Sequence, residues 1–170
     1  MLVVAGTVLA EEGADASMRD IARRAGMGLA TLLRHFPTRD ALLEALLRTS
    51  FDELTARADA LGDTGSPRDG LLLWLREFVA FTTEHYGVVT STVKAIEEPG
   101  SALHDSCVAL HAAGAQLLAR AQAAGEAPVD VDGADLFALV SAFAWLGDQT
   151  RQEQRAERLF GLVTSAILSR

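Results

Sequence analysis

Apolar side chains recur every three or four residues along almost the whole chain, the spacing that places them on one face of a helix. No segment alternates apolar and polar residues in the manner of a half-buried strand. Within residues 39–61, for example, Leu42, Leu43, Leu46 and Leu47 fall on a single helical face. The pattern predicts an all-α protein with helices over about residues 1–12, 17–25, 28–36, 39–61, 67–86, 88–98, 101–124, 133–147 and 151–169.

Capping residues mark several of these boundaries. Ser17 and Asp20 form an acidic version of the capping box at the start of the second helix. Ser66, followed by proline, has the same role for a later helix, and Thr38 is expected to cap the helix that follows it. The glycines within residues 26–28 are expected to end the second helix and to form a turn before the third.

Composition limits the classes of protein that remain. The chain has 170 residues, of which 49% are hydrophobic, and this is enough for one or two small domains with a buried core. No apolar run approaches the ~18 residues of a membrane span, and residues 1–10 lack the basic leader of a signal peptide. Cys107 is the single cysteine, so an intramolecular disulfide is excluded and a reducing cytoplasm is expected.

Charge is unevenly distributed along the chain. The net charge of −8, taken as a whole, argues against binding to nucleic acid. Residues 17–39, however, contain five arginines against the single acid Asp20, whereas residues 51–170 contain 9 basic and 17 acidic side chains. A phosphate backbone senses the local patch, because charges beyond ~10 Å are screened at ordinary salt. From charge alone, a solvated helix face is the simpler interpretation of the basic segment.

Residues 17–36 have the arrangement of a helix-turn-helix, with a short capped helix, a glycine turn and a second short helix. Arginines are expected on the outer face, and Ile21, Leu32 and Phe36 are expected to point inward. An α-helix fits the major groove of DNA while neighbouring cations hold phosphates. Short helical hairpins are common, so the spacing by itself favours DNA binding without establishing it.

The segment from Glu11 to Leu46 resembles the DNA-binding domain of the TetR family of transcriptional regulators. The matching stretches are Glu-x-Gly, RDIARRAGMG and TLLRHFPTRDALL, in that order and spacing. The resemblance implies a DNA-binding domain over residues 1–46 and a helical ligand-binding and dimerisation domain over residues 47–170. Residues 51–170 resemble the family in length and in their all-helical layout.

The resemblance also implies roles for single residues. Thr31 is expected to be the main polar group at base edges or at a phosphate, while the two residues before it offer apolar contacts, for instance to a thymine methyl. Ser17, His35 and Arg39 are expected to hold phosphates. The full set of expected DNA-binding residues is Ser17, Arg24, Gly28, Leu29, Ala30, Thr31, Leu33, Arg34, His35 and Arg39.

Two departures from the family pattern bear on affinity. Leu33 stands where the family usually has a tyrosine that donates a hydrogen bond to a phosphate, which removes a contact of roughly 1 kcal/mol. The sequence also begins at Met1 without the basic arm that is common upstream of the first helix. Either translation starts upstream, or the protein binds DNA through fewer phosphate contacts. Fewer contacts predict a flatter salt dependence and a larger share of specificity from DNA shape.

The segment beyond residue 50 carries amphipathic side chains that suit a small-molecule pocket, although ordinary helix-bundle core is an equal interpretation for each. His104, Cys107 and His111 fall on one helix face. A structural zinc site needs four ligands and no fourth is evident, so no metal is expected, and the three form either a polar pocket wall or a packed face. The expected pocket residues are Trp74, Phe78, Phe81, His85, Tyr86, Thr90, His104, Cys107, His111 and Phe137.

The last two helices carry more apolar surface than a small bundle needs. In the family such helices form a four-helix interface with their symmetry mates, and the alternative here is burial within one chain. A dimer of this kind would set two recognition helices about one DNA turn apart. The apolar positions are Leu136, Leu139, Val140, Phe143, Leu146, Leu159, Leu162, Val163, Ile167 and Leu168.

Together these features predict a cytoplasmic, ligand-responsive transcriptional regulator. We expect a repressor that binds a palindromic operator in double-stranded DNA as a homodimer and is released by a small apolar or amphipathic effector. The alternative is a ligand-binding or protein-interaction dimer whose headpiece no longer binds DNA. No Gly-rich phosphate loop, nucleophile motif or plausible carboxylate pair is evident, so neither enzymatic activity nor a cofactor is expected.

Overall fold

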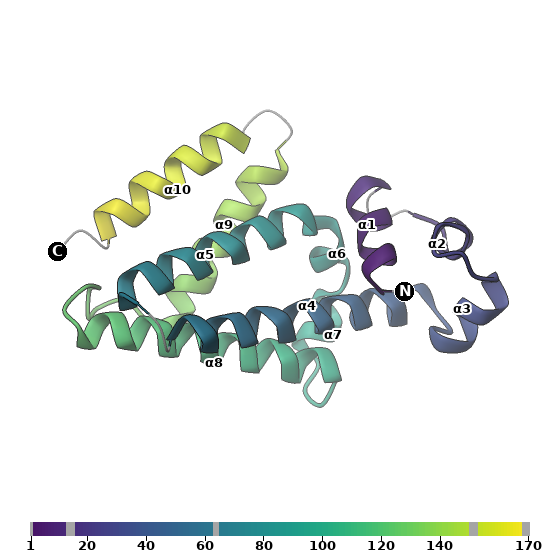
Figure 1. Cartoon of the computed structure of the whole chain (residues 1–170), viewed down its shortest axis with the longest axis horizontal. Helices are drawn as coiled ribbons and strands as arrows, with labels where there is room; N and C mark the ends of the chain where they lie inside the picture. Colours follow the sequence, from purple (N-terminus) through teal and green to yellow (C-terminus); the bar gives the residue numbers. More distant parts are fainter. Residues whose placement is uncertain (1, 13–15, 63–64, 150–152, 168–170) are drawn as a thin grey trace. The chain divides into compact units, whose positions relative to one another are not determined.

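The computed structural model describes residues 2–12, 16–62, 65–149 and 153–167 (Figure 1). Every regular element in these ranges is a helix, which confirms the predicted all-α fold. None of the described helices is long and apolar enough to cross a membrane. In chain order the helices are α1 (Leu2–Glu12), α2 (Met18–Arg24), α3 (Leu29–His35), α4 (Arg39–Gly62), α5 (Pro67–Glu84), α6 (Tyr86–Ser91), α7 (Val93–Glu97), α8 (Ala102–Ala123), α9 (Gly133–Asp148) and α10 (Glu153–Ile167).

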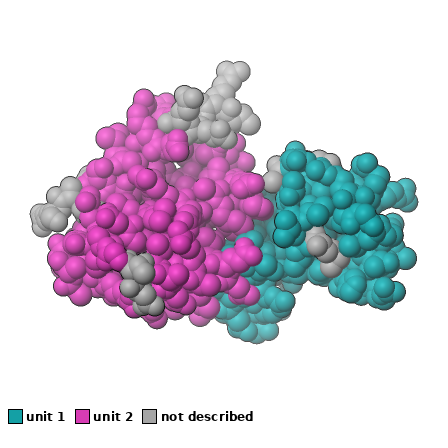
Figure 2. All heavy atoms as spheres, viewed as in Figure 1, with its two compact units in different colours: residues 1–51, 87–107 teal, residues 52–86, 108–170 magenta. Residues whose placement is uncertain are grey.

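The chain divides into two compact units, which are coloured separately in Figure 2. Unit 1 comprises residues 1–51 and 87–107, and unit 2 comprises residues 52–86 and 108–170. The helices α4 and α8 each contribute residues to both units. The expected domain boundary after residue 46 stays a prediction.

Side-chain caps begin several helices at the residues that the sequence indicated. Ser17 Oγ accepts a hydrogen bond from the backbone N–H three residues ahead at 3.1 Å, and Ser66 Oγ accepts the equivalent bond at 3.3 Å. Thr38 Oγ1 caps the start of α4 in the same way at 3.1 Å. A complete capping box at α9 was not foreseen: Asp132 and Asp135 each accept a hydrogen bond from the other's backbone N–H at 3.0 Å.

The prediction of one helix over residues 88–98 is wrong, because α6 ends before Thr92 and α7 begins after it. Thr92 Oγ1 donates to the carbonyl oxygens of Val88 and Val89, at 2.9 and 3.2 Å. A hydroxyl that bonds to the preceding turn competes with the backbone ladder and bends a helix. Thr92 accordingly has φ −108° and ψ 8°, outside the α-helical range.

The core of unit 2 centres on Trp74 of α5, whose side chain is fully buried. Trp74 Nε1 donates a hydrogen bond of 2.9 Å to the carbonyl oxygen of Leu54 in α4. The indole centroid lies 5.3 Å from the ring of Phe78 and 6.3 Å from the ring of Phe137 in α9. Gly114 of α8 leaves room for the indole, because a Cβ at this position would lie 2.5 Å from Trp74 Cη2. Trp74 therefore joins α4, α5, α8 and α9.

Replacing Gly114 with alanine tests this close approach. We expect Gly114→Ala to lower the free energy of unfolding by about 1–3 kcal/mol, because the new methyl overlaps a buried ring. Helix propensity alone would raise it by up to about 1 kcal/mol. Trp74→Phe removes the overlapping atoms, so the double variant should lose less stability than the sum of the single changes. Urea unfolding measures all three variants, and strict additivity would contradict the proposed overlap.

Candidate nucleic-acid interface and apolar cavity

A tight turn at residues 25–28 connects α2 to α3 in unit 1. Gly26 has φ +66°, a left-handed conformation that glycine adopts without steric cost. The N–H of Gly26 bonds to the carbonyl oxygen of Arg23 at 3.2 Å, and the N–H of Met27 bonds to that of Ala22 at 3.0 Å. These bonds close the end of α2, so the predicted glycine turn is confirmed. Gly28 then caps α3 through its backbone, with φ −70° and ψ 143°.

The short helix α3 has one buried face and one exposed face. Leu32 has no exposed surface, as expected for an inward residue, and it is the buried residue of α3. Thr31 and Leu29 are half-buried beside it. The opposite face is exposed, and the side chain of Leu33 has 38% of its surface in solvent. The exposed members of the predicted DNA-binding set on α3 are Ala30, Leu33, Arg34 and His35.

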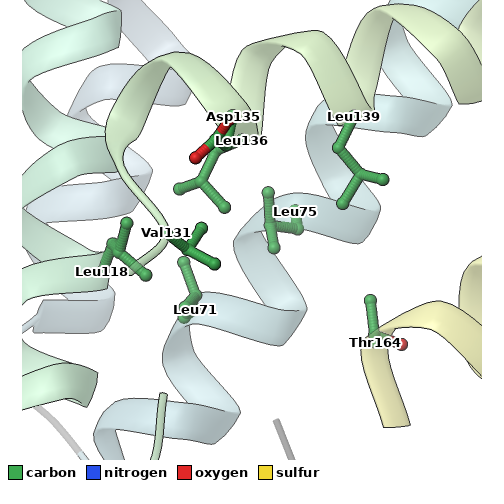
Figure 3. Close-up of a pocket in the computed structure, with 8 residues that line it drawn as sticks. All are labelled: Leu71, Leu75, Leu118, Val131, Asp135, Leu136, Leu139 and Thr164. Atoms are coloured by element: carbon green, nitrogen blue, oxygen red, sulfur yellow. The ribbon is translucent and has the colours of Figure 1, made fainter. Parts of the chain in front are cut away.

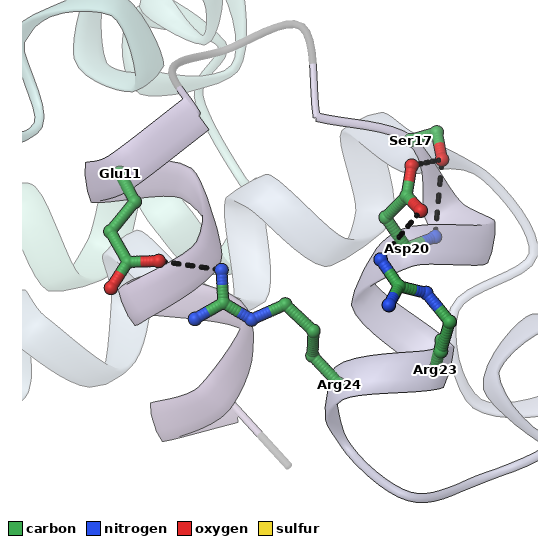
Figure 4. Close-up of polar contacts among 5 residues, drawn as sticks. All are labelled: Glu11, Ser17, Asp20, Arg23 and Arg24. Atoms are coloured by element: carbon green, nitrogen blue, oxygen red, sulfur yellow. Dashed lines mark hydrogen bonds and ion pairs between the residues drawn. The ribbon is translucent and has the colours of Figure 1, made fainter.

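Two carboxylates, Glu11 of α1 and Asp20 of α2, accept hydrogen bonds from three side chains of α2 and its cap (Figure 4). Ser17 Oγ donates to Asp20 Oδ2 at 2.5 Å, and Arg23 Nη2 lies 3.2 Å from Asp20 Oδ1. Arg24 Nη1 lies 2.5 Å from Glu11 Oε2, which links α2 to α1. These partners stabilise the charged acids: hydrogen bonds from Ser17 and Arg23 lower the pKa of Asp20, and the hydrogen bond and charge of Arg24 lower the pKa of Glu11.

Arg39 has a backbone partner that no local motif indicates. Its Nε donates to the carbonyl oxygen of Ala16 at 3.4 Å, and its Nη2 is buried without a hydrogen-bond partner. The side chain as a whole is half-buried at the start of α4. In the free protein Arg39 thus links the start of α4 to the residue before the cap of α2. Its expected contact with a phosphate stays a prediction.

Four of the residues expected to form a ligand pocket cluster in unit 2, where Trp74 and Phe78 are buried, Phe137 is half-buried and His111 is exposed. Trp74, Phe78 and Phe137 are in mutual ring contact, with centroids 5.4 Å apart for the two phenylalanines. His111 stacks on Phe137 with a centroid separation of 3.5 Å, and desolvation lowers the pKa of its imidazole. Because Trp74 is fully buried and Phe78 nearly so, both act as core residues in this structure.

Other members of that expected pocket make local contacts. In unit 2, Phe81 stacks on His85 with centroids 4.6 Å apart, and Tyr86 is half-buried. Thr90, His104 and Cys107 are residues of unit 1. Two of them form hydrogen bonds with nearby backbone carbonyl oxygens: Thr90 Oγ1 donates to Gly87 O at 3.1 Å, and His104 Nδ1 bonds to Ile96 O at 2.8 Å. The third, Cys107, is partly buried, and this burial raises the pKa of its thiol. Among the described residues, no cluster of three or more acidic, His or Cys side chains is arranged to hold a metal ion.

Unit 2 contains an apolar cavity of about 200 Å³ that the sequence did not indicate (Figure 3). Its walls come from α5, α8, α9, α10 and the loop before α9. Leucine and valine side chains make most of the lining, and Asp135 and Thr164 are the two polar residues among those that line it. The Thr164 hydroxyl already donates to Phe160 O at 2.7 Å, and Asp135 accepts the capping-box bond. The lining residues are Leu71, Leu75, Leu118, Val131, Asp135, Leu136, Leu139 and Thr164.

The helices α9 and α10 pack partly on each other and partly expose apolar side chains. Phe143 of α9 and Phe160 of α10 meet edge to face with centroids 5.4 Å apart. Trp145 and Leu162 have 54% and 61% of their side-chain surface exposed. Some of the apolar face is therefore buried within the chain, and some is available to a partner. Leu168, which was assigned to this face, lies outside the described residues.

Two protein-family models match the sequence, one in its N-terminal part and one in its C-terminal part. A model of bacterial regulatory proteins of the tetR family matches residues 2–46. A model of the C-terminal domain of SbtR-like transcriptional regulators matches residues 66–167. No curated protein matches the sequence.

Solved structures with the same fold include close relatives. A TetR transcriptional regulator from Streptomyces coelicolor is 34% identical with a TM-score of 0.78, covering 98% of this chain and 95% of its own. A TetR regulatory protein from Mycobacterium vanbaalenii is 30% identical with a TM-score of 0.73, covering 98% and 92%. The transcriptional regulator FadR from Bacillus subtilis, solved in complex with stearoyl-CoA, is 14% identical with a TM-score of 0.67, covering 99% and 96%, and shows the fold alone.

A matched pair of serine substitutions tests the turn between α2 and α3. We expect Gly26→Ser to lower the free energy of unfolding by about 1–2 kcal/mol, because a side chain is strained in the left-handed conformation. Gly28→Ser should leave the free energy of unfolding unchanged or raise it by roughly 0.3 kcal/mol, because serine is a good N-cap and a Cβ at this position meets no close neighbour. Urea unfolding measures both, and equal losses would mean that the turn does not depend on φ at Gly26.

Proposed function

Because this chain belongs to the TetR family of bacterial transcriptional regulators, we propose that it is a homodimeric repressor that binds a partly palindromic operator through α3. A small apolar effector, bound in unit 2, releases the operator. The observation that carries the DNA-binding part is the division of α3 into a buried anchor, Leu32, and an exposed face that bears Arg34 and His35.

Recognition by α3 combines few base contacts with several phosphate contacts. Thr31 provides a hydroxyl for a base edge, and Ala30 provides a methyl that fits against thymine. Arg34 and His35, exposed at the end of α3, hold phosphates and orient the helix without reading sequence. With this small set of reading groups, much of the specificity comes from the shape and deformability of the operator.

A homodimer through α9 and α10 gives the operator its symmetry. The exposed Trp145 and Leu162 supply apolar surface for such an interface, and large aromatic side chains are typical anchors of protein contacts. Two-fold symmetry places the two copies of α3 about 34 Å apart, so that each enters the major groove of one half-site.

We place the effector in the apolar cavity of unit 2. Its volume of about 200 Å³ lies between an engineered ~150 Å³ cavity that binds benzene and the ~300 Å³ of the smallest drug pockets. A one-ring hydrocarbon or a short branched one fits this volume. The lining is almost entirely apolar and includes no basic side chain, so burial of an anionic ligand there would cost free energy without compensation. The large, anionic stearoyl-CoA of the Bacillus subtilis regulator is therefore not a guide to the effector of this chain.

Release of DNA follows from a shift in population. The effector binds best to a conformation in which the two copies of α3 no longer match the operator spacing. The helix α4 has residues in both units, so a change around its unit 2 end is carried along a continuous helix to unit 1. For full release the effector must favour the released conformation by roughly 3–5 kcal/mol.

Selection of bound sequences from random duplex DNA, at low and near-physiological salt, tests the DNA-binding part. We expect enrichment of a palindrome with half-sites about one helical turn apart. Arg34→Ala should weaken binding to all sequences about equally and reduce the slope of log affinity against log salt by about 0.9. Thr31→Ala should instead change the preferred base at one position of each half-site.

Arg76→Ala is the matched control, because Arg76 is an exposed arginine of α5 in unit 2 and should not alter DNA affinity. If no sequence is enriched and Arg34→Ala has no effect, the headpiece does not bind DNA. The chain is then a ligand-binding or protein-interaction dimer.

Toluene is a suitable probe for the effector cavity. At about ten times its Kd a ligand stabilises the folded state by roughly 1.4 kcal/mol, which raises the Tm of a chain of this size by about 3–5 °C. We expect this rise in the wild-type protein, together with weaker binding to the selected operator. Leu139→Phe fills the cavity from its half-buried wall and should abolish both effects.

Leu73→Phe makes the same change on α5 at a side chain that is 41% exposed and does not line the cavity, so it should respond to toluene as the wild type does. Equal responses of the two phenylalanine variants would place toluene elsewhere. No response in the wild type would remove the cavity as an effector site.

A further inference from the structure

On the surface of the helix-turn-helix, carboxylates already accept hydrogen bonds from several of the side chains that could bind a DNA phosphate. Arg24 and Ser17 belong to the predicted DNA-binding set, and Arg23 is exposed beside them. In the free protein each of the three donates to a carboxylate: Arg24 to Glu11, and both Ser17 and Arg23 to Asp20 (Figure 4). A carboxylate and a phosphate present similar charged oxygens to arginine and hydroxyl donors.

These contacts have the geometry of charge-assisted bonds but lie at the surface. The Arg24–Glu11 pair joins two helices at 2.5 Å, while 54% of the Glu11 side chain remains exposed. The Arg23–Asp20 pair is longer, at 3.2 Å, and 72% of the Arg23 side chain is exposed. Exposed pairs contribute little to stability and exchange readily, so another anion can replace either carboxylate.

We propose that Glu11 and Asp20 are internal competitors of DNA phosphates, which occupy Arg24, Arg23 and Ser17 in the free protein and are displaced when DNA binds. This inference rests on the proposed DNA binding. Each displaced acid is left beside the phosphate backbone, where like charges repel. The two acids therefore reduce affinity for every sequence about equally, and base and shape contacts make up a larger share of binding to the operator.

The acids remain charged throughout the physiological range of pH. Hydrogen bonds from Ser17 and Arg23 lower the pKa of Asp20, and those from Arg24 lower the pKa of Glu11. A group with a lowered pKa loses its charge below its usual titration range, so competition is constant near pH 7 and disappears in acid.

The test compares Glu11→Gln and Asp20→Asn with the wild-type protein, using a selected operator and an unrelated duplex at two salt concentrations. We expect each variant to bind both duplexes about 2- to 5-fold more tightly at low salt, the range that exposed ion pairs support. The gain should shrink as salt rises, because exposed charges are screened. Both substitutions keep the size of the side chain, and a thermal melt confirms that the variants fold.

Asp40→Asn is the matched control for the loss of one negative charge, because Asp40 is an exposed acid on the first turn of α4 in unit 1. A double-mutant cycle isolates the specific pair. In the Arg24→Ala background, the gain from Glu11→Gln should fall to the level of Asp40→Asn, since the donor that Glu11 occupies is absent.

An equal gain from Glu11→Gln in both backgrounds would overturn the proposal, because the acid would then act through general charge alone. If the wild-type protein binds DNA and the Glu11→Gln and Asp20→Asn variants bind no more tightly, the proposal is also overturned, while DNA binding itself stands. If neither the wild type nor any variant binds duplex DNA at low salt, the proposed function fails, and this inference fails with it.

Discussion

The indole of Trp74 is fully buried, and its N–H is satisfied by the backbone carbonyl oxygen of Leu54 rather than by water. A buried donor without an acceptor is costly, so this bond fixes how α5 lies on the unit 2 part of α4. Gly114 brings α8 close to the ring, and Phe137 brings α9 against its edge. Leu71 and Leu75 flank Trp74 along α5, so the residue that fixes the helix also fixes one wall of the cavity.

Unit 1 depends on a smaller anchor. The helix α3 has seven residues, which is too short to be stable in isolation, so burial of Leu32 and the turn at Gly26 hold it in place. The same shortness leaves most of its side chains exposed. A surface of this kind carries DNA-binding groups without serving the core. The arginines of the neighbouring helix α2 are likewise at the surface, where they pair with Glu11 and Asp20 at little cost to the fold.

The proposed repressor depends on weak interactions both at its DNA-binding helices and in its effector cavity. Exposed pairs such as Arg24–Glu11 contribute little to stability, and a ligand in a 200 Å³ cavity makes few contacts. Release of an operator needs a difference of roughly 3–5 kcal/mol between two conformations, to which effector binding in both subunits of a dimer contributes. Weak phosphate binding and a small effector are thus compatible parts of one switch.

Sequence by itself determined most of the helices, the caps at Ser17 and Ser66 and the turn at Gly26, because these features depend on residues a few positions apart. It also determined the family, through the ordered motifs within residues 11–46. It missed the break at Thr92, where a hydroxyl competes with the backbone ladder. Tertiary structure decided which aromatic side chains are buried in the core and where the apolar cavity of unit 2 lies. It also paired Arg24 with Glu11, thirteen residues away, and Arg39 with Ala16, twenty-three away. Such partners meet when distant segments pack, and no local spacing encodes that meeting.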